Sequence, residues 1–125
     1  MNCTGNKLPL TYDLVYYRGD TFKRTIRLRS LNENGTPGPE LDLSGCTVLS
    51  QVREYTDGKI LTTIDAQVDP DQVTNKGQIH LVMDTTFTSY EGEVGVWDME
   101  VTWPDTTKVT YLKGKVINDL DVSHV

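Results

Sequence analysis

The side chains that could carry catalysis are few and widely spaced in this sequence. The only histidines are His80 and His124, and the second follows Ser123. A nucleophile needs a base within hydrogen-bond reach and a third group that orients the base, and these positions offer no such set. Asp98 and Glu100 lie two residues apart, which suits a glycosidase only where a cleft surrounds both carboxyl groups. We therefore predict that the protein is not an enzyme.

No group of residues has the spacing of a metal or cofactor site. Asp65, Asp69 and Asp71 resemble the carboxylate clusters that bind calcium, but their segment lacks the glycine and the closing glutamate of a calcium-binding loop. The two cysteines, Cys3 and Cys46, have no further ligand at zinc spacing. They could pair with each other only if the N-terminal segment folded back, and thiols usually stay free in a reducing cytosol. The sequence predicts neither a metal nor a cofactor.

The overall charge and hydropathy of the chain exclude two classes of partner. The 125 residues carry a formal net charge of −6, whereas a general nucleic-acid binder has a basic balance. No apolar run approaches the roughly 18 residues that span a membrane. The N-terminal residues contain no apolar core of the kind found in signal peptides. We expect no nucleic acid and no membrane among the partners.

Charge is distributed unevenly along the chain. Residues 1–30 contain six Lys or Arg and two Asp, whereas residues 65–105 contain nine Asp or Glu and one Lys. Two interpretations are open: the segments form two solvated faces, or a basic edge of one subunit meets an acidic edge of the next. The second interpretation makes Lys23, Arg27 and Arg29, which share one register of a predicted strand, a candidate assembly surface.

Apolar and polar residues alternate along most of the chain, which is typical of half-buried β-strands. Breaker residues, such as those at 34–39, separate the alternating segments. The expected strands are residues 12–17, 21–30, 46–54, 59–68, 78–83, 95–103 and 108–117. We predict a single seven-stranded antiparallel β-sandwich domain at 12–117. It is flanked by an N-terminal arm at 1–11 and a C-terminal tail at 118–125, and we expect both to be ordered against other subunits.

The registers of these strands separate core residues from solvent-facing ones. Trp103 shares the register of Trp97 but precedes Pro104 at a strand end. We expect its side chain to be partly exposed and to serve as an anchor for a partner, so it joins the candidate assembly surface. The expected core residues are Phe22, Ile26, Leu28, Ile79, Leu81, Trp97, Met99 and Val101.

Short motifs follow one another in a recognisable order. They are Arg18-Gly19-Asp20-Thr21, Asp42-Leu43-Ser44-Gly45, Gln51-Val52-Arg53-Glu54, Asp57-Gly58, Trp97-Asp98-Met99-Glu100-Val101 and Lys113-Gly114-Lys115-Val116. Over residues 12–118 this order resembles the β-sandwich modules of tailed-bacteriophage virions. The nearest of these is the immunoglobulin-like N-terminal domain of phage baseplate upper proteins, with related tail and head-attachment proteins.

The resemblance implies an immunoglobulin-like sandwich with a structural, non-enzymatic role. It implies a virion protein, made in the host cytoplasm and placed in the tail, baseplate, neck or fibre-attachment point. The expected partners are other virion proteins and copies of the chain itself in a symmetric homo-oligomer. In a ring of this kind, one patch meets a different patch on the next copy.

Other functions stay open at this stage. A capsid-decorating (cement) protein is a close variant of the same role. A carbohydrate-binding module is an alternative from another class, because aromatic rings exposed together on a sandwich can stack on sugars. Arg18-Gly19-Asp20 also matches the tripeptide that integrins bind, but turning the chain into the next strand is a sufficient role for Gly-Asp.

Overall fold

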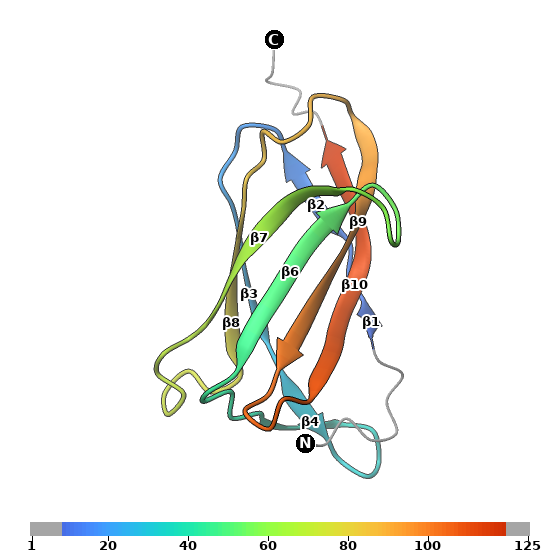
Figure 1. Cartoon of the computed structure of the whole chain (residues 1–125). Coiled ribbons are helices and arrows are strands. Elements are labelled where there is room, and N and C mark those ends of the chain that lie inside the picture. The colour runs from blue at the N-terminus through green and yellow to red at the C-terminus, as the bar shows by residue number, and fades with distance from the viewer. Residues whose placement is uncertain (1–8, 120–125) are drawn as a thin grey trace.

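The computed structural model describes residues 9–119, and its regular elements in this range are all β-strands (Figure 1). The all-β prediction is therefore confirmed. No helix in this range is long or apolar enough to cross a membrane. The strands are β1 (Leu10–Thr11), β2 (Leu14–Tyr17), β3 (Phe22–Arg27), β4 (Arg29–Leu31), β5 (Pro37–Glu40), β6 (Thr47–Arg53), β7 (Ile60–Val68), β8 (Gln78–Met83), β9 (Gly92–Thr102) and β10 (Lys108–Asp119).

The expected ordered arms fall mainly outside the described residues. Residues 1–8 and 120–125 lie beyond the described range, as does Cys3, so the possible pairing with Cys46 lies there too. The described ends of both arms belong to the sheet rather than to separate segments: β1 begins at Leu10, and β10 continues to Asp119.

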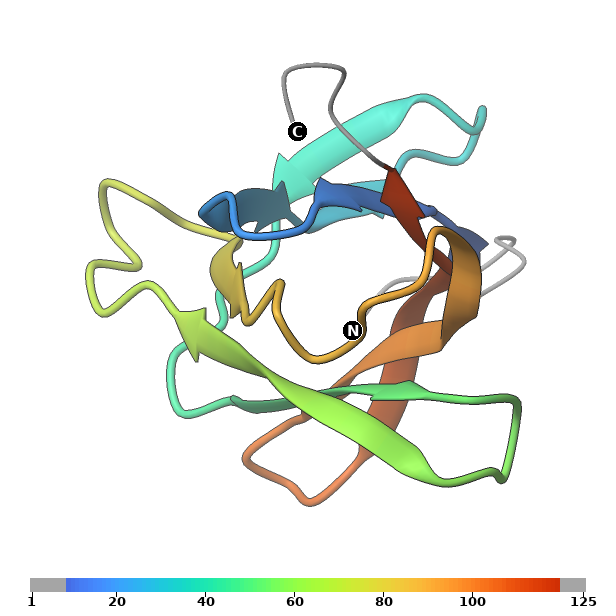
Figure 2. The same ribbon diagram turned by 90° about the horizontal axis from the view of Figure 1, so that it is seen from above.

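Eight strands form one sheet in the order β1–β10–β9–β6–β7–β8–β3, with β2 also paired to β10. Strand β7 connects two layers, because residues 60–64 pair with β6 whereas residues 65–68 pair with β8. Viewed from above, the sheet curls round its core, and β4 pairs only with β5 beside it (Figure 2). The curl brings β2 and β3, from the two ends of the strand order, to one side of the molecule, where residues of both line a small hollow.

The predicted antiparallel seven-stranded arrangement differs from the structure in strand direction. Both β1 and β2 run parallel to β10. The chain leaves β2 through the turn at residues 18–21, where Asp20 N donates to Tyr17 O, and enters the other layer as β3. Strand β2 is therefore free to pair with β10 instead of with its successor. Alternation indicates that a segment is a strand but not which strand it pairs with, so the parallel pairing had no signal in the sequence.

The strand predicted at 21–30 is in fact two strands. Leu28 separates β3 from β4: its N–H donates to Gly77 O, and its carbonyl accepts from Leu41 N. The first bond joins Leu28 to the residue before β8, and the second joins it to the residue after β5. The chain therefore stops pairing with β8 at Leu28 and begins to pair with β5. The loop predicted at residues 32–40 contains β5, which pairs with β4. The breaker residues there mark a short edge hairpin and not an unstructured loop.

The core prediction is confirmed for all but one of the named residues: Ile26 is half-buried, and the other seven are buried. Tyr111 and Leu112 are both buried although they are adjacent, which simple alternation does not allow. A register shift between Thr110 and Leu112 explains this, because a bulge lets two successive residues turn inward.

Trp97 holds the segment between β1 and β2 against the sheet by a hydrogen bond and a ring contact. Its indole Nε1 donates to the carbonyl of Tyr12 at 2.7 Å, and the two rings meet edge to face at 6.3 Å between centroids. Gly114 lies opposite Trp97 on β10, and a Cβ there would collide with the Tyr12 carbonyl. Asp13 Oδ1 accepts from Lys115 N at 2.9 Å. The bend between β1 and β2 is thus held by an indole, a glycine and a carboxylate.

Candidate assembly surface and groove

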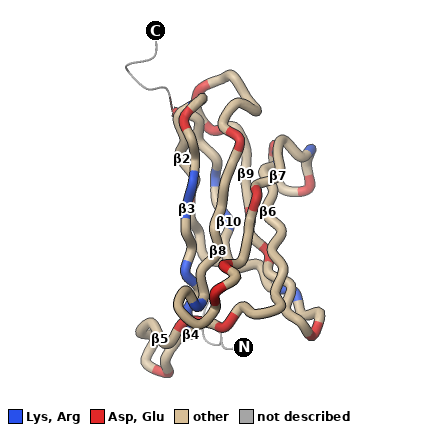
Figure 3. The backbone as a smooth tube through the Cα atoms, turned by 90° about the vertical axis from the view of Figure 1, so that its left-hand side faces the viewer, with Lys and Arg blue, Asp and Glu red and all other residues tan. Residues whose placement is uncertain are grey.

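Lys23 and Arg27 lie on the outer face of β3, the last strand at one end of the sheet. The positions of Lys and Arg residues, in blue, follow β3 along the backbone in Figure 3. Both side chains are exposed, and within residues 9–119 neither has an acidic partner within ion-pair distance. The register places Lys23 beside Val82, and Val82 beside Asp65 on β7. The outer face of this layer is therefore basic at its open edge and acidic at β7.

Arg29 and Trp103, the other two residues of the predicted surface, do not join this face. Arg29 belongs to β4, where its guanidinium lies 3.1 Å from Glu40 Oε1, so its charge already has a partner. Trp103 follows β9 in the other layer and is half-buried against the core. The four residues of the predicted surface therefore do not lie together. Only Lys23 and Arg27 share one exposed face.

A hydrogen-bonded network crosses the same face and was not predicted from the sequence. Thr25 Oγ1 lies 3.1 Å from His80 Nδ1, and His80 Nε2 lies 2.7 Å from Asp69 Oδ2. The hydrogen bond with His80, and that from Asp71 N, lower the pKa of Asp69. The register Thr25–His80 spans 55 residues of sequence, so only the strand pairing brings the three side chains together.

A hydroxyl, an imidazole and a carboxylate in this order have the connectivity of a hydrolytic triad. Catalysis also requires donors for an oxyanion and a site that holds the substrate beside the nucleophile. Thr25 is exposed on a strand face, and neither Thr25 nor His80 lines the groove described below or the small hollow between β2 and β3. The network is better explained as a link that fixes β3, β8 and the 69–77 loop to one another.

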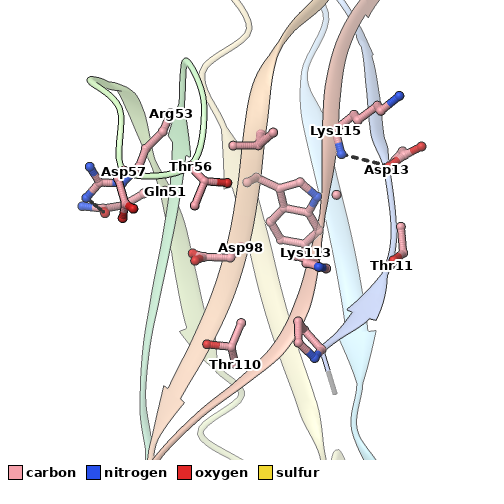
Figure 4. A pocket seen from close by; sticks show the side chains of 14 residues that line it. Thr11, Asp13, Gln51, Arg53, Thr56, Asp57, Asp98, Thr110, Lys113 and Lys115 are labelled. Carbon is pink, nitrogen blue, oxygen red and sulfur yellow. Dashed lines mark hydrogen bonds between the residues drawn. The ribbon is translucent and has the colours of Figure 1, made fainter. Parts of the chain in front are cut away.

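The largest concave feature is a groove of about 560 Å³ on the outer face of β6, β9 and β10 (Figure 4). The β6–β7 loop forms one wall, and the segment from Pro9 to Asp13 forms the other. Glu54 N donates to Lys59 O and closes this loop, in which only Asp57 has a positive φ, of 65°. Asp57-Gly58 thus lies in the hairpin loop between β6 and β7, which is longer than a two-residue turn.

The floor of the groove carries an amide, a carboxylate and an ammonium group side by side on three neighbouring strands. Asp98 on β9 lies between Gln51 on β6 and Lys113 on β10. Arg53 donates to Gly58 O at 2.8 Å and to Gln51 Oε1 at 3.1 Å, which ties the loop to the floor. Such a surface can offer hydrogen bonds of both kinds to a polar ligand. The groove includes Asp98 but not Glu100, so it does not surround the carboxylate pair that a glycosidase would use.

Partial burial raises the pKa of Asp98, and the neighbouring Glu100 raises it further, against the opposing effect of Arg53. A carboxyl group whose pKa is higher in the folded state destabilises the fold when it is ionised, and this penalty shrinks as the pH falls through the folded-state pKa. We expect Asp98→Asn to raise the melting temperature at pH 7 and to lose this advantage below about pH 4. Thermal unfolding of both proteins across this range checks the prediction, and a lower melting temperature at pH 7 would contradict it.

No protein-family model matches the sequence, and no curated protein matches it. Among solved structures, the chain is similar to part of a family 123 glycoside hydrolase from Clostridium perfringens, which was analysed for glycolipid glycan hydrolysis. The TM-score is 0.36 and the identity 14%, over 88% of this chain and 23% of that chain. The chain thus spans less than a quarter of that hydrolase, and a similarity this low carries no argument about activity.

Proposed function

We propose that this chain is a non-enzymatic structural component of a bacteriophage particle that acts by protein–protein assembly. Its place is the tail, baseplate, neck or fibre-attachment point, and its partners are other virion proteins and copies of itself. The observation that carries the proposal is the open edge of β3, whose exposed Lys23 and Arg27 have no acidic group within ion-pair distance in residues 9–119. Asp65 lies on the same face at β7, so the face offers two unlike patches, as a head-to-tail ring requires.

The strand neighbours also support the immunoglobulin-like part of the proposal. In such domains the third, sixth and seventh strands form one sheet, and the second and fifth strands are in the other. Here β6, β9 and β10 are neighbours in one layer, and β3 and β8 are neighbours in the other. Strand β7 crosses between them. The grouping fits if β2 and β3 are taken as the first and second strands.

The proposal predicts that charge reversal on β3 blocks assembly without unfolding the chain. Lys23→Glu with Arg27→Glu changes two exposed side chains, so we expect a stability change within about 1 kcal/mol. Incorporation into particles should fall at least tenfold, since unlike charges set register and partner choice. The matched control is Lys59→Glu, an exposed lysine in the β6–β7 loop. Quantitative blotting of purified particles gives the measurement, and normal incorporation of the double variant would show that Lys23 and Arg27 do not act in assembly.

The N-terminal arm is tested separately. Deleting residues 1–8 leaves β1, which begins at Leu10, in place. If the arm locks neighbouring subunits together, the shortened chain should fold as a monomer and be lost from particles. Unchanged incorporation of this folded chain would show that the arm does not act in assembly.

A carbohydrate-binding module is a second candidate, and the groove on β6, β9 and β10 is the observation that favours it. Its floor offers hydroxyl, amide, carboxylate and ammonium groups, but its tryptophan, Trp97, is only 2% exposed and cannot stack on a sugar ring. The exposed rings of Tyr55 and Tyr90 do not line the groove. A glycan array that gives a specific signal, abolished by Asp98→Ala, would establish this second function in place of the first.

A further inference from the structure

The open edge of β3 presents unpaired backbone groups in a regular pattern. Leu28 N donates to Gly77 O at 2.8 Å, and the register continues through Ile26 opposite Ile79. In an antiparallel pair, residues alternate between bonding to the partner and turning their N–H and C=O groups away from it. Since the even-numbered residues bond to β8, Lys23, Thr25 and Arg27 turn their backbone groups to the free edge.

One contact confirms this alternation and shows that the edge is only partly protected. Arg24 Nη1 donates to the carbonyl of Lys23 at 2.8 Å, and the guanidinium lies 4.3 Å from the centre of the Phe22 ring. Within the described residues, no hydrogen bond occupies the outward backbone groups of Thr25 or Arg27. The middle and end of the edge are therefore available to another strand.

The charges on the edge determine which strand can pair there. Two copies of β3 placed side by side would bring Lys23 and Arg27 against the same cations, and like charges opposite one another destabilise a sheet. Charged edges of this kind prevent self-association. An acidic strand meets no such repulsion, and its carboxylates would lie beside Lys23 and Arg27. The edge thus selects against pairing with a second β3 strand and in favour of an acidic segment.

A small hollow beside the edge limits the size of the other side chains that a pairing strand can carry. It measures about 120 Å³ and is lined by residues of β2 and β3, among them Tyr16, Phe22 and Arg24. Side chains of an added strand point alternately to the two faces. Those opposite to the acids would point towards this hollow, where the exposed side chains of Val15 and Tyr17 offer apolar contact for a small side chain such as valine.

We propose that the β3 edge binds an extended acidic segment of a partner protein as an added strand. The segment carries carboxylates four residues apart, matching Lys23 and Arg27, with small apolar residues at the alternate positions. Backbone hydrogen bonds to Thr25 and Arg27 supply the affinity, and the two cations and the hollow supply the specificity, as in other cases of strand addition. The proposal rests on the assembly function and names the kind of partner that this edge accepts.

A synthetic peptide tests the proposal directly on the full chain. The peptide Val-Glu-Val-Thr-Val-Glu-Val reads the same in both directions, so it presents its glutamates correctly in a parallel or an antiparallel strand. We expect saturable binding by fluorescence anisotropy that weakens as salt is raised. A peptide of the same composition with its glutamates adjacent, and one with lysine for glutamate, should bind at least about tenfold more weakly. No binding of the first peptide, or equal binding of all three, would overturn the proposal.

Two changes separate backbone pairing from simple charge attraction. Thr25→Pro removes an N–H that faces the free edge, a position where an edge strand accepts proline, and it keeps both cations. N-methylation of the central peptide residues removes the matching groups from the other side and does not touch the protein. Either change should abolish binding, whereas Lys59→Glu should leave it unchanged. Full binding of the N-methylated peptide would show that no strand forms, even if Thr25→Pro fails to fold.

The outcomes also separate this inference from the proposed function. If the peptide binds as expected while the parent chain is absent from particles, the strand site stands and the phage-assembly function fails. If the peptide binds and the Lys23→Glu, Arg27→Glu chain still enters particles, the strand site stands but is not needed for assembly. If that chain is excluded from particles while the peptide does not bind, assembly stands and pairing at the β3 edge is overturned.

Discussion

Replacing Trp97 with alanine is expected to destabilise the protein by about 3 to 5 kcal/mol, the usual range for removing a large buried aromatic side chain. The side chain is 2% exposed, and its Nε1 donates to the Tyr12 carbonyl. The substitution therefore leaves a cavity and also releases the bend that joins β1 to β2. Denaturant unfolding measures the loss of free energy, and hydrogen exchange at Tyr12 and Lys115 should rise further than in the core strands.

Trp97→Phe is the matched control, because it keeps an aromatic ring and removes the indole N–H. It should lower the free energy of unfolding by less than the alanine variant does. About 1 kcal/mol of that loss should come from the missing indole hydrogen bond. If Trp97→Ala costs less than about 1 kcal/mol, the indole does not hold the N-terminal strands and this account of the fold is wrong.

Alanine at Gly95 or at Gly114 is expected to have the next largest effect on stability. A Cβ at Gly95 would collide with the carbonyl of Arg53, and one at Gly114 with the carbonyl of Tyr12. In both cases the obstacle is backbone, which cannot move aside as a flexible side chain can. Overpacking of this kind costs about 1 to 3 kcal/mol. Thermal and denaturant unfolding of the two variants provide the measurement.

Lys115→Ala is the control for the glycine variants, because it changes an exposed residue next to Gly114 on β10. It should alter stability by no more than about 0.5 kcal/mol. Gly114→Ala should also loosen β1, whereas Gly95→Ala should disturb the β6–β9 pairing. If both glycine variants are as stable as the parent chain, the close packing of Gly95 on Arg53 and of Gly114 on Tyr12 does not contribute to stability.

The period-two pattern was enough to predict the all-β fold and most of the core. Phe22, Ile79 and Met99 are buried where their registers placed them, because alternation directly reports which side of a strand faces the core. The partner of each strand was not predictable in this way. The parallel pairing of β2 with β10 depends on the path of the turn at 18–21, and the change of partner at Leu28 depends on bonds to Gly77 and Leu41.

The candidate surface was predictable only where its residues share a strand. Lys23 and Arg27 alternate on β3 and lie on one face, as expected. Arg29 continues the same alternation but sits on β4 beside Glu40, and no local pattern indicates this change. The Thr25–His80–Asp69 network joins three separate segments, and so does the groove. Features of this kind appear only when the strand order is known.

Immunogold labelling of purified particles tests the central claim, that this chain is a structural component of a virion, most directly. An antibody raised against the folded domain would be applied to phage particles from cells that produce the chain. The account predicts gold at one defined position on each intact particle, at the tail, baseplate, neck or a fibre-attachment point. Particles that carry no label, with the chain recovered wholly in the particle-free fraction, would contradict it.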